Sequence, residues 1–438
     1  KKKVMDKPTS EFSVELERLC LKDGSVEQAK HAVRVLCSMA QSSSSDSPAS
    51  VSSSPSSLKK LDEPTAVETL DRLMAAFASP KQLKVDNKRL LVVLLGIREV
   101  TKTFSHLFEP YASQVRKFVL GELIFKENDE LVKTKATKKK TTISEDCSRF
   151  CAALKVLSYD QSPLVKISSE IDGDSDDEAE EEVKNGTVVD LLFNILDGEV
   201  PGGKGRFTAT EIIQIRRVAS CSILRLATHF ELSPAQWHNL GWTMQDSEDR
   251  VRVKFMRTVA DLVKMVKLPL RFVAYLVLAT SESDATEKKN AADSLLSAIK
   301  RLRQEHLRRM SALSEESILE ESISVMEASM MLDDGLDDER RLLNTSLIPE
   351  YVLPYAVHLL AHHPDFPSNK TDVTRIKTCE RHLKALLDPL INSLGAEADN
   401  ISFLLQMFSK MVEHKDALDG DTFRIHLIAS IGKKALKK

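Results

Sequence analysis

Apolar residues recur at spacings of three and four along most of this chain, and this is the feature that most limits its possible folds. The spacing matches the 3.6-residue period of an amphipathic helix. Each run is about 12–20 residues long, within the usual range of globular helices. The clearest runs lie in residues 26–40, 104–119, 212–226, 255–266 and 403–411. Prolines separate many of the runs, and the pattern predicts an all-α protein.

Length and composition narrow the architecture further. With 438 residues, the chain exceeds the size at which a single compact core stops growing. It must therefore form several domains or an elongated repeat array. Aromatic residues make up only 5%, and 14 Gly and 15 Pro are few for a sheet protein of this length. A hydrophobic content of 42% indicates that most of the chain folds.

Residues 246–265 (DSEDRVRVKFMRTVADLVKM) carry the best clue to the kind of array. An acidic turn, then Val-Arg, then apolar residues on one face is typical of the second helix of a HEAT repeat. We expect Asp246 to cap this helix, Val251 and Phe255 to point inward, and Arg252 to reach the acidic turn of a neighbouring repeat. The predicted fold class is all-α, a HEAT-repeat or armadillo-like α-solenoid. Because the sequence has only one clean copy, an irregular helical domain without true repeats is the alternative.

Composition also divides the chain into helical stretches and biased inserts. One Ser-rich segment and two acidic segments bury too little apolar area to offset chain entropy, so we expect disorder there. The second acidic segment is expected to hold a short helix. The predicted parts are a helical repeat start at 1–40, a Ser-rich disordered linker at 41–60, HEAT-like helical repeats at 61–169, an acidic disordered insert at 170–186, HEAT-like helical repeats at 187–313, an acidic, mostly disordered insert at 314–341 and C-terminal helical repeats at 342–438.

Two motifs resemble enzyme sites but lack an essential residue. Residues 198–205 (GEVPGGKG) nearly match a phosphate-binding loop, yet a glycine occupies the position that needs a hydroxyl for magnesium. His358 and His362 lie one helical turn apart, as in zinc peptidases, but Leu359 replaces the glutamate and no third ligand follows at a sensible spacing. We interpret these histidines and His363 as helix-end residues. The sequence predicts no catalytic residue, no cofactor and no metal site, and hence no enzyme.

Cysteines and apolar runs bear on compartment and membrane. The six cysteines lie mostly inside helical patterns and are interpreted as buried thiols in a reducing compartment. No apolar run reaches the roughly 18 residues of a membrane span, and no secretory signal is visible. We therefore expect no membrane partner. The net charge of -3 gives no global attraction to DNA.

Local clusters of basic residues are more informative than net charge. Arg216 and Arg217 lie together on one predicted helix, and Arg252 and Lys254 lie on another. One interpretation is solvated helix faces and salt bridges between repeats. The other is a groove that takes an acidic partner peptide, an inositol phosphate or a DNA backbone. Both stay open, and these residues are candidate partner-binding positions.

Several stretches of the chain resemble one known family. Residues 28–33 (QAKHAV), 215–227 (IRRVASCSILRLA), 268–272 (LPLRF) and 348–366 (IPEYVLPYAVHLLAHHPDF) follow the order and spacing of motifs in the precocious-dissociation-of-sisters (Pds-five) family. The longest is similar to the family's LPEYVVPYxxHLLAHDPDY, with His363 where the family has aspartate. The resemblance covers nearly the whole chain and is to the C-terminal portion of the family.

This resemblance implies a non-enzymatic HEAT-repeat scaffold in the nucleus, associated with chromatin, that regulates sister-chromatid cohesion. The partners it implies are cohesin, bound through the kleisin subunit, and a Wapl-type release factor. Within the longest motif, Tyr351, Tyr355 and His358 recur at helical spacing. They are candidate partner contacts, although tyrosines buried in a core are the commoner explanation.

Two other function classes stay open at the level of sequence. HEAT rods also serve nuclear import and vesicle coats, so a transport or trafficking adaptor is one alternative. The second is a nucleic-acid binder that acts through Lys133–Lys140 (KTKATKKK) and the helical arginines. Binding of that kind weakens steeply with salt.

Overall fold

The computed structural model shows an all-helical chain that divides into two compact units, unit 1 (Lys1–Phe230) and unit 2 (Glu231–Lys438). Within the described residues the only β contact is an isolated bridge between Lys166 and Thr187, so the predicted all-α class is confirmed. The structure describes residues 11–42, 63–79, 83, 87–125, 143–160, 162–169, 186–202, 205–282, 284–324, 347–367, 372–393, 400–416, 420 and 422–437.

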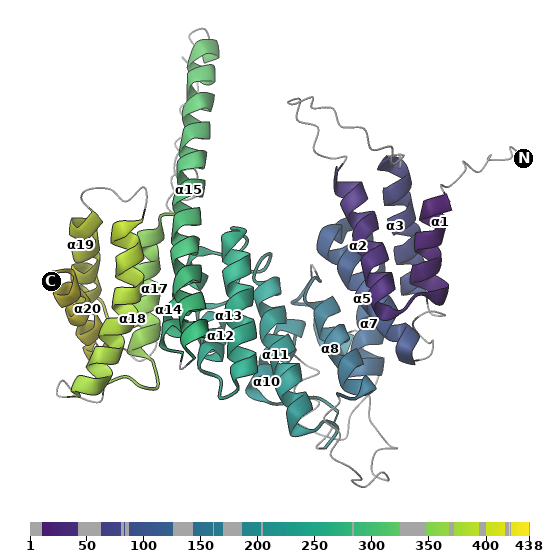
Figure 1. Cartoon of the computed structure of the whole chain (residues 1–438), viewed down its shortest axis with the longest axis horizontal. Helices are drawn as coiled ribbons and strands as arrows, with labels where there is room; N and C mark the ends of the chain where they lie inside the picture. The colour runs from purple at the N-terminus through teal and green to yellow at the C-terminus, as the bar shows by residue number, and fades with distance from the viewer. Residues whose placement is uncertain are drawn as a thin grey trace, which may run out of the picture. The chain divides into compact units, whose positions relative to one another are not determined.

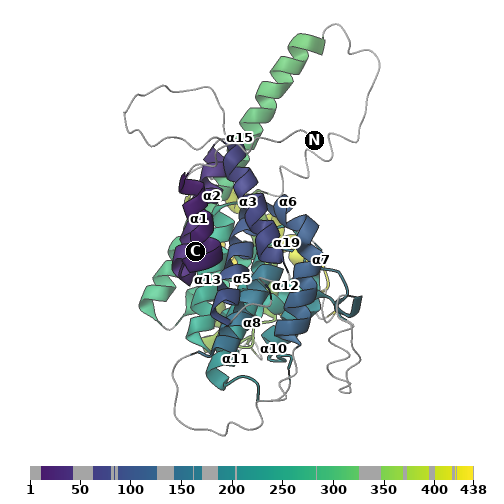
Figure 2. The same cartoon turned by 90° about the vertical axis from the view of Figure 1, so that its right-hand side faces the viewer.

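Unit 1 consists of consecutive helices that pair and stack in chain order. Its elements are α1 (Glu11–Arg18), η1 (Leu19–Asp23), α2 (Val26–Ser42), α3 (Glu63–Ala78), α5 (Asn87–Thr103), α6 (Ser105–Phe108), η2 (Glu109–Tyr111), α7 (Ala112–Phe118), η3 (Val119–Ile124), α8 (Glu145–Leu157), η5 (Ile167–Ser169), α10 (Val188–Asp197) and α11 (Ala209–Leu226). Helices α2, α5, α8 and α11 pack on one another in succession, and α3, η3 and α10 pack against this row. Figures 1 and 2 show α1, α2 and α3 side by side at the start of the stack.

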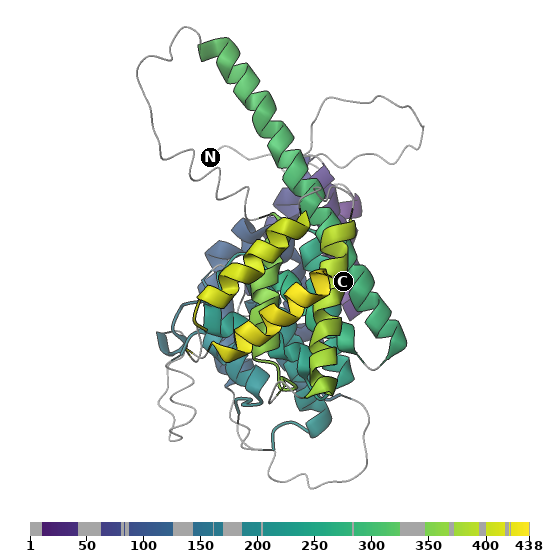
Figure 3. The same cartoon turned by 90° about the vertical axis from the view of Figure 1, so that its left-hand side faces the viewer.

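Unit 2 repeats the same arrangement. Its elements are α12 (Pro234–Gly241), η6 (Trp242–Gln245), α13 (Asp249–Lys264), η7 (Leu270–Phe272), α14 (Val273–Leu278), η8 (Ala279–Ser281), α15 (Ala285–Ser324), η9 (Pro349–Tyr351), α17 (Val352–Ala361), α18 (Val373–Asn392), α19 (Asn400–Glu413) and α20 (Phe423–Leu436). Helices α13, α15, α18 and α20 pack in succession, and α14, α17 and α19 form the neighbouring layer. The C-terminal part of α15 extends beyond the other helices of unit 2 (Figures 1 and 3).

The acidic turn of the predicted HEAT helix lies where the sequence placed it, and its arginine reaches the next helix pair. Val251 and Phe255 are fully buried. Arg252 Nε donates to Glu282 Oε1 (2.6 Å) in the turn before α15, and its Nη1 donates to the backbone oxygen of Asp246 (2.6 Å). The predicted link between repeats is therefore confirmed.

Side-chain caps fix where several helices begin. Ser233 caps α12 in a capping box with Gln236, and Pro234 occupies the first helical position. The predicted cap of α13 by Asp246 is wrong, because α13 begins after Glu248 without a side-chain cap. Asp246 Oδ1 instead accepts a hydrogen bond from the backbone N–H of Glu248 (2.9 Å). The carboxylate thus accepts a backbone hydrogen bond within the turn that precedes the helix.

The cores of both units hold the thiols that the sequence predicted to be buried. All six cysteines are free and buried: Cys20, Cys37, Cys147, Cys151, Cys221 and Cys379. Burial raises the pKa of Cys20 to about 12 and that of Cys37 to about 11. Among the described residues, no helix is both long and apolar enough to span a bilayer.

The predicted inserts fall largely outside the described residues. This holds for 43–60 of the Ser-rich linker, for 170–185 of the first acidic insert and for the basic run 133–140. The second acidic insert begins inside α15, which continues to Ser324. The short helix expected there is thus the end of a longer one. Residues 325–341 of that insert also lie outside the described residues.

Candidate partner-binding surfaces

Basic side chains line the successive helices α2, α5, α8 and α11 of unit 1. They are Arg34 on α2, Arg98 on α5, Lys155 on α8, and Arg217 and Arg225 on α11. We call these five residues the cation row. Arg34 is exposed and the other four are half-buried. Because the four helices pack on one another in turn, cations that are far apart in sequence act on each other.

Lys155 experiences the charges of three other members of the cation row. Burial lowers the pKa of Lys155, and the charges of Arg98, Arg225 and Arg217 lower it further. Burial also lowers the pKa of Arg98, and the charges of Arg225 and Arg34 act in the same direction. Like charges in partly desolvated positions repel each other more strongly than they do in water. A bound anion would relieve this repulsion.

Within the described residues, a single carboxylate compensates the cation row. Glu99 Oε2 accepts from Arg34 Nε (2.9 Å), and Glu99 Oε1 accepts from Arg98. The Glu99 side chain is buried between the two. The Nε–H of Arg98 is buried and has no acceptor among the described residues. The other three cations have no ion-pair partner in the described part of the chain, so the row keeps a strong excess of positive charge.

Sequence analysis identified one member of this row as a candidate site. Arg217 belongs to the row, whereas its neighbour Arg216 is half-buried and is not among the charges that act on Lys155. Arg98 and Lys155 escaped prediction because neither has another basic residue within three positions along the chain. Only the stacking of α5, α8 and α11 brings them together, and no local sequence signal reports that stacking.

Arg252 and Lys254 lie on α13 of unit 2 and differ in their surroundings. The hydrogen bonds of Arg252 to Glu282 raise its pKa, and Asp249 acts in the same direction. Its guanidinium is therefore held by the turn of the next helix pair, which is a structural role. Lys254 is exposed on the same helix. A contact of either residue with a partner stays a prediction.

Two partly exposed tyrosines lie in residues 348–366, the longest of the motifs that resemble the family. Tyr351 and Tyr355 are 38% and 39% exposed. The Tyr351 ring meets Phe403 of α19 edge-on, with centroids 6.0 Å apart, and the Tyr355 ring meets Trp237 of α12 at 5.6 Å. Each ring is thus packed on one side and accessible on the other. Aromatic rings in this situation suit a partner contact.

His358, the third candidate in this motif, belongs to a cluster of imidazoles. Its Nε2 lies 3.1 Å from Nδ1 of His238, whose Nε2 accepts a hydrogen bond from Trp242 Nε1 (3.1 Å). One turn along α17, His362 Nε2 lies 2.8 Å from Oδ2 of the buried Asp416. Three residues, His358, His362 and Asp416, each offer one potential metal-ligand atom, and these three atoms lie within 4.8 Å of one another. No third ligand follows these histidines at the spacing of a sequence motif, but the fold brings Asp416, 54 residues beyond His362, beside them.

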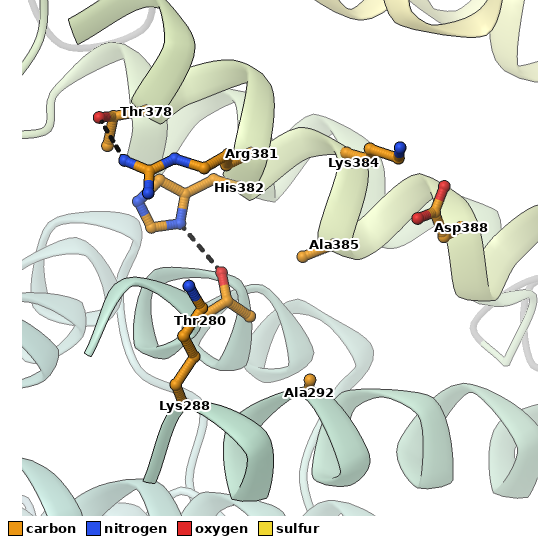
Figure 4. Close-up of a pocket in the computed structure, with 9 residues that line it drawn as sticks. All are labelled: Thr280, Lys288, Ala292, Thr378, Arg381, His382, Lys384, Ala385 and Asp388. Atoms are coloured by element: carbon orange, nitrogen blue, oxygen red, sulfur yellow. Dashed lines mark hydrogen bonds between the residues drawn. The ribbon is translucent and has the colours of Figure 1, made fainter. Parts of the chain in front are cut away.

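A small basic pocket lies between η8, α15 and α18 (Figure 4). Its volume is about 280 Å³, and it is lined by Thr280, Lys288, Ala292, Thr378, Arg381, His382, Lys384, Ala385 and Asp388. His382 Nδ1 carries a proton, because it bonds the carbonyl of Val277 (2.9 Å), which can only accept. Burial lowers the pKa of His382 to about 4. The neutral ring therefore holds α18 against α14 and adds no charge to the pocket at pH 7.

Comparison with known proteins identifies a family that matches the whole chain and relatives that match about half of it. The family model described as "Sister chromatid cohesion protein PDS5 protein" matches residues 1–438. Sister chromatid cohesion protein PDS5 homolog B of Homo sapiens is 25% identical over 250 residues, which are 56% of this chain and 15% of the relative. The homolog B of Gallus gallus gives the same values. Homolog A-B of Xenopus laevis is 24% identical over 216 residues, 48% of this chain and 14% of that protein.

The matched region is a small part of the relatives' own length. The matched part spans about 15% of the length of the homolog B relatives. One solved structure, the crystal structure of an engineered protein, covers 98% of this chain and is covered over 99% of its own length at 14% identity. The TM-score is 0.27.

Proposed function

The chain belongs to the PDS5 family of sister chromatid cohesion proteins, and from this premise we propose that it is a non-enzymatic scaffold that regulates cohesion. Its proposed partners are the cohesin complex, bound through the kleisin subunit, and a Wapl-type release factor. Its proposed location is the nucleus, on chromatin. The observation that carries the proposal is the cation row, which combines unmet positive charge with a continuous run of stacked helices.

The dimensions of the cation row suit an extended peptide. It crosses four helices, α2, α5, α8 and α11, that pack in succession. Packed helices lie about 8–10 Å apart, so three such steps span about 24–30 Å. An extended segment covers about 3.3–3.6 Å per residue, so about seven to nine residues reach from one end to the other. We infer that the row takes an acidic segment of a partner in this form.

The chemistry of the row matches carboxylates better than neutral groups. Arg98 has a buried Nε–H without an acceptor among the described residues, and a carboxylate accepts such donors with charge-assisted hydrogen bonds. Lys155 supplies a central charge whose repulsion by its neighbours falls when an anion binds. A partner segment without stable structure of its own can order along such a surface.

The test is a charge reversal within the row, compared with an equal reversal outside it. The Lys155→Glu/Arg217→Glu variant should bind the purified kleisin subunit at least about tenfold more weakly than the unaltered chain, a difference of about 1.4 kcal/mol. The control is Lys22→Glu/Lys117→Glu, which changes the net charge equally at two exposed lysines of unit 1. It should bind normally. Isothermal titration calorimetry measures both affinities.

Other outcomes of this experiment would remove the proposal. If the unaltered chain does not bind kleisin and does not associate with cohesin in nuclear extracts, the proposed function is wrong. If the control loses as much affinity as the row variant, the row is not the binding surface. DNA is the alternative ligand. Steeply salt-dependent retention on duplex DNA that the row variant loses, with kleisin binding unchanged, would assign the row to nucleic acid.

A further inference from the structure

Unit 2 holds a cluster of metal-ligating side chains that the proposed function does not use. His358 and His362 are four residues apart on α17, which places them on one face of the helix. Their ring centroids are 4.9 Å apart. Asp416 comes from the segment after α19 and reaches them because α17 packs against α19 and α20. The fold thus brings together three groups that are separated in sequence.

We propose that His358, His362 and Asp416 bind a divalent transition-metal ion, with Zn²⁺ the best match, through Nε2 of each histidine and one carboxylate oxygen. Two imidazoles and a carboxylate form a donor set that zinc takes in sites with three protein ligands. Mg²⁺ and Ca²⁺ prefer oxygen ligands throughout. Tetrahedral zinc, with bonds of about 2.0–2.2 Å, holds its ligand atoms about 3.3–3.5 Å apart. Ligand atoms already within 4.8 Å of one another need only small side-chain movements to reach this geometry.

The burial of Asp416 supports a cation at this position. Its side chain has no exposed surface, and that of His362 is only 10% exposed. A buried carboxylate is unfavourable unless positive charge or hydrogen bonds compensate it. In the arrangement without metal, the hydrogen bond to His362 Nε2 contributes this compensation. A metal ion would replace the proton of that bond and supply a larger positive charge to the same oxygen.

His238 lies beside the cluster, but its hydrogen bonds exclude it from the ligand set. The indole N–H of Trp242 can only donate, so the His238 Nε2 that it bonds must accept. The proton of neutral His238 therefore sits on Nδ1 and is donated to His358 Nε2. A metal ion that takes the His358 Nε2 lone pair displaces this donor. His238 consequently competes with the metal.

An ion bound here would connect two consecutive helix pairs of unit 2. Two ligands belong to α17, and the third belongs to the connection between α19 and α20. A ligand that binds only the folded state raises stability by mass action. The site is therefore a structural clamp, and a thermal midpoint that rises with added Zn²⁺ reports its occupation.

The test uses the full 438-residue chain, freed of metal with a chelator and titrated with Co²⁺ and Zn²⁺. We expect one equivalent of Co²⁺ to give the visible d–d bands of a tetrahedral ion without a thiolate charge-transfer band. His362→Asn and Asp416→Asn should each weaken Zn²⁺ binding by at least about tenfold, since even outer-shell changes cost ~10–100-fold. The His238→Phe variant, which lacks the competing donor, should bind with equal or higher affinity.

His414→Asn is the matched control, because His414 is exposed and lies two residues before Asp416. It should bind Zn²⁺ like the unaltered chain, and circular dichroism checks that every variant is helical. Octahedral Co²⁺ spectra, full binding by the His362→Asn/Asp416→Asn double variant, or an equal loss in the control would each overturn the proposal. A tenfold loss in His238→Phe would show that the assigned ligand set is wrong. A thiolate band would place the ion on cysteines.

Discussion

The two units stack their helices in the same way but treat the charges on those helices differently. In unit 2, two arginines of the stacked helices have carboxylate partners in the next helix pair: Arg252 pairs with Glu282, and Arg303 pairs with Glu350. In unit 1, Lys155 and Arg217 have no such partner within the described residues. Arginines that pair with a carboxylate connect one repeat to the next, whereas cations without such a partner are available to bind an anionic group of another molecule.

The best-developed link of unit 2 joins three helix pairs. Arg303 of α15 donates through Nη2 to Glu350 Oε1 (2.6 Å) and to the backbone oxygen of Leu390 (2.6 Å). Asn400 Nδ2 donates to the same two oxygens, at 3.0 and 2.7 Å. The charged groups of Arg303 and Glu350 are nearly enclosed, with side chains 8% and 6% exposed. Lys155 of unit 1 is the opposite case, because no carboxylate among the described residues pairs with it.

The largest effect should come from breaking the Arg303 link. Replacing Arg303 by Met leaves the Glu350 carboxylate buried without its counter-charge, which should lower the free energy of unfolding by about 3–5 kcal/mol. Urea denaturation followed by circular dichroism measures the change. Arg309→Met on the same helix is the control, since its pair with Glu305 is partly open to solvent and should cost under about 1 kcal/mol. Equal losses in the two variants would remove the distinction between buried links and surface pairs.

A smaller effect is expected from acidification, and it should arise in unit 2. The pKa of His382 is lowered from 6.5 to about 4 by burial. The unfolded chain therefore takes up this proton first as the pH falls. The contribution of His382 to the free energy of unfolding is nearly constant above pH 6.5 and is lost between pH 6.5 and pH 4. From pH 7 to pH 5 this residue should remove roughly 2 kcal/mol of unfolding free energy.

The His382→Asn variant isolates this contribution. Asparagine keeps a donor near the position of Nδ1, so the hydrogen bond to Val277 can survive, but the side chain cannot take up a proton. Its urea midpoint should fall less between pH 7 and pH 5 than that of the unaltered chain. Parallel pH profiles for the two proteins would show that His382 does not carry the effect.

The smallest effect, in unit 1, has the opposite sign. Lys155→Met removes a half-buried charge that its neighbours repel, so unfolding should require up to about 1 kcal/mol more. The same variant should bind the kleisin subunit more weakly, because the central charge of the row is gone. Lys117→Met, at an exposed lysine of α7, should change neither property. A loss of stability in Lys155→Met would contradict the view that the row is unfavourable without a partner.

Local features of the fold could be predicted from the sequence. The helical period of the apolar residues indicated the helices. The contact of Arg252 with an acidic turn also followed, since the turn and the arginine belong to a recognisable repeat unit. The predicted N-cap of α13 was wrong by two residues. Whether the helix begins after Asp246 or after Glu248 depends on backbone torsions that composition does not report.

The candidate sites depend on stacking, and little of them could be predicted. Lys155 and Arg98 meet Arg217 only because three helices from different repeats pack in succession. Asp416 joins His358 and His362 from 54 residues beyond His362, a separation that no metal-binding motif specifies. Sequence periodicity sets which face of each helix is buried, but it does not fix which exposed residues of neighbouring helices become adjacent.

The six buried thiols allow the opening of each unit to be timed. Alkylating reagents attack the thiolate, and burial keeps the pKa of Cys20 at about 12 and that of Cys379 at about 11. Native Cys20 and Cys379 should therefore react only when their helices come apart. Cys20 lies in unit 1, whereas Cys379 lies in unit 2. Mass spectrometry of the labelled peptides would thus measure the labelling rate of each cysteine, and hence the opening rate of each unit, without an added probe.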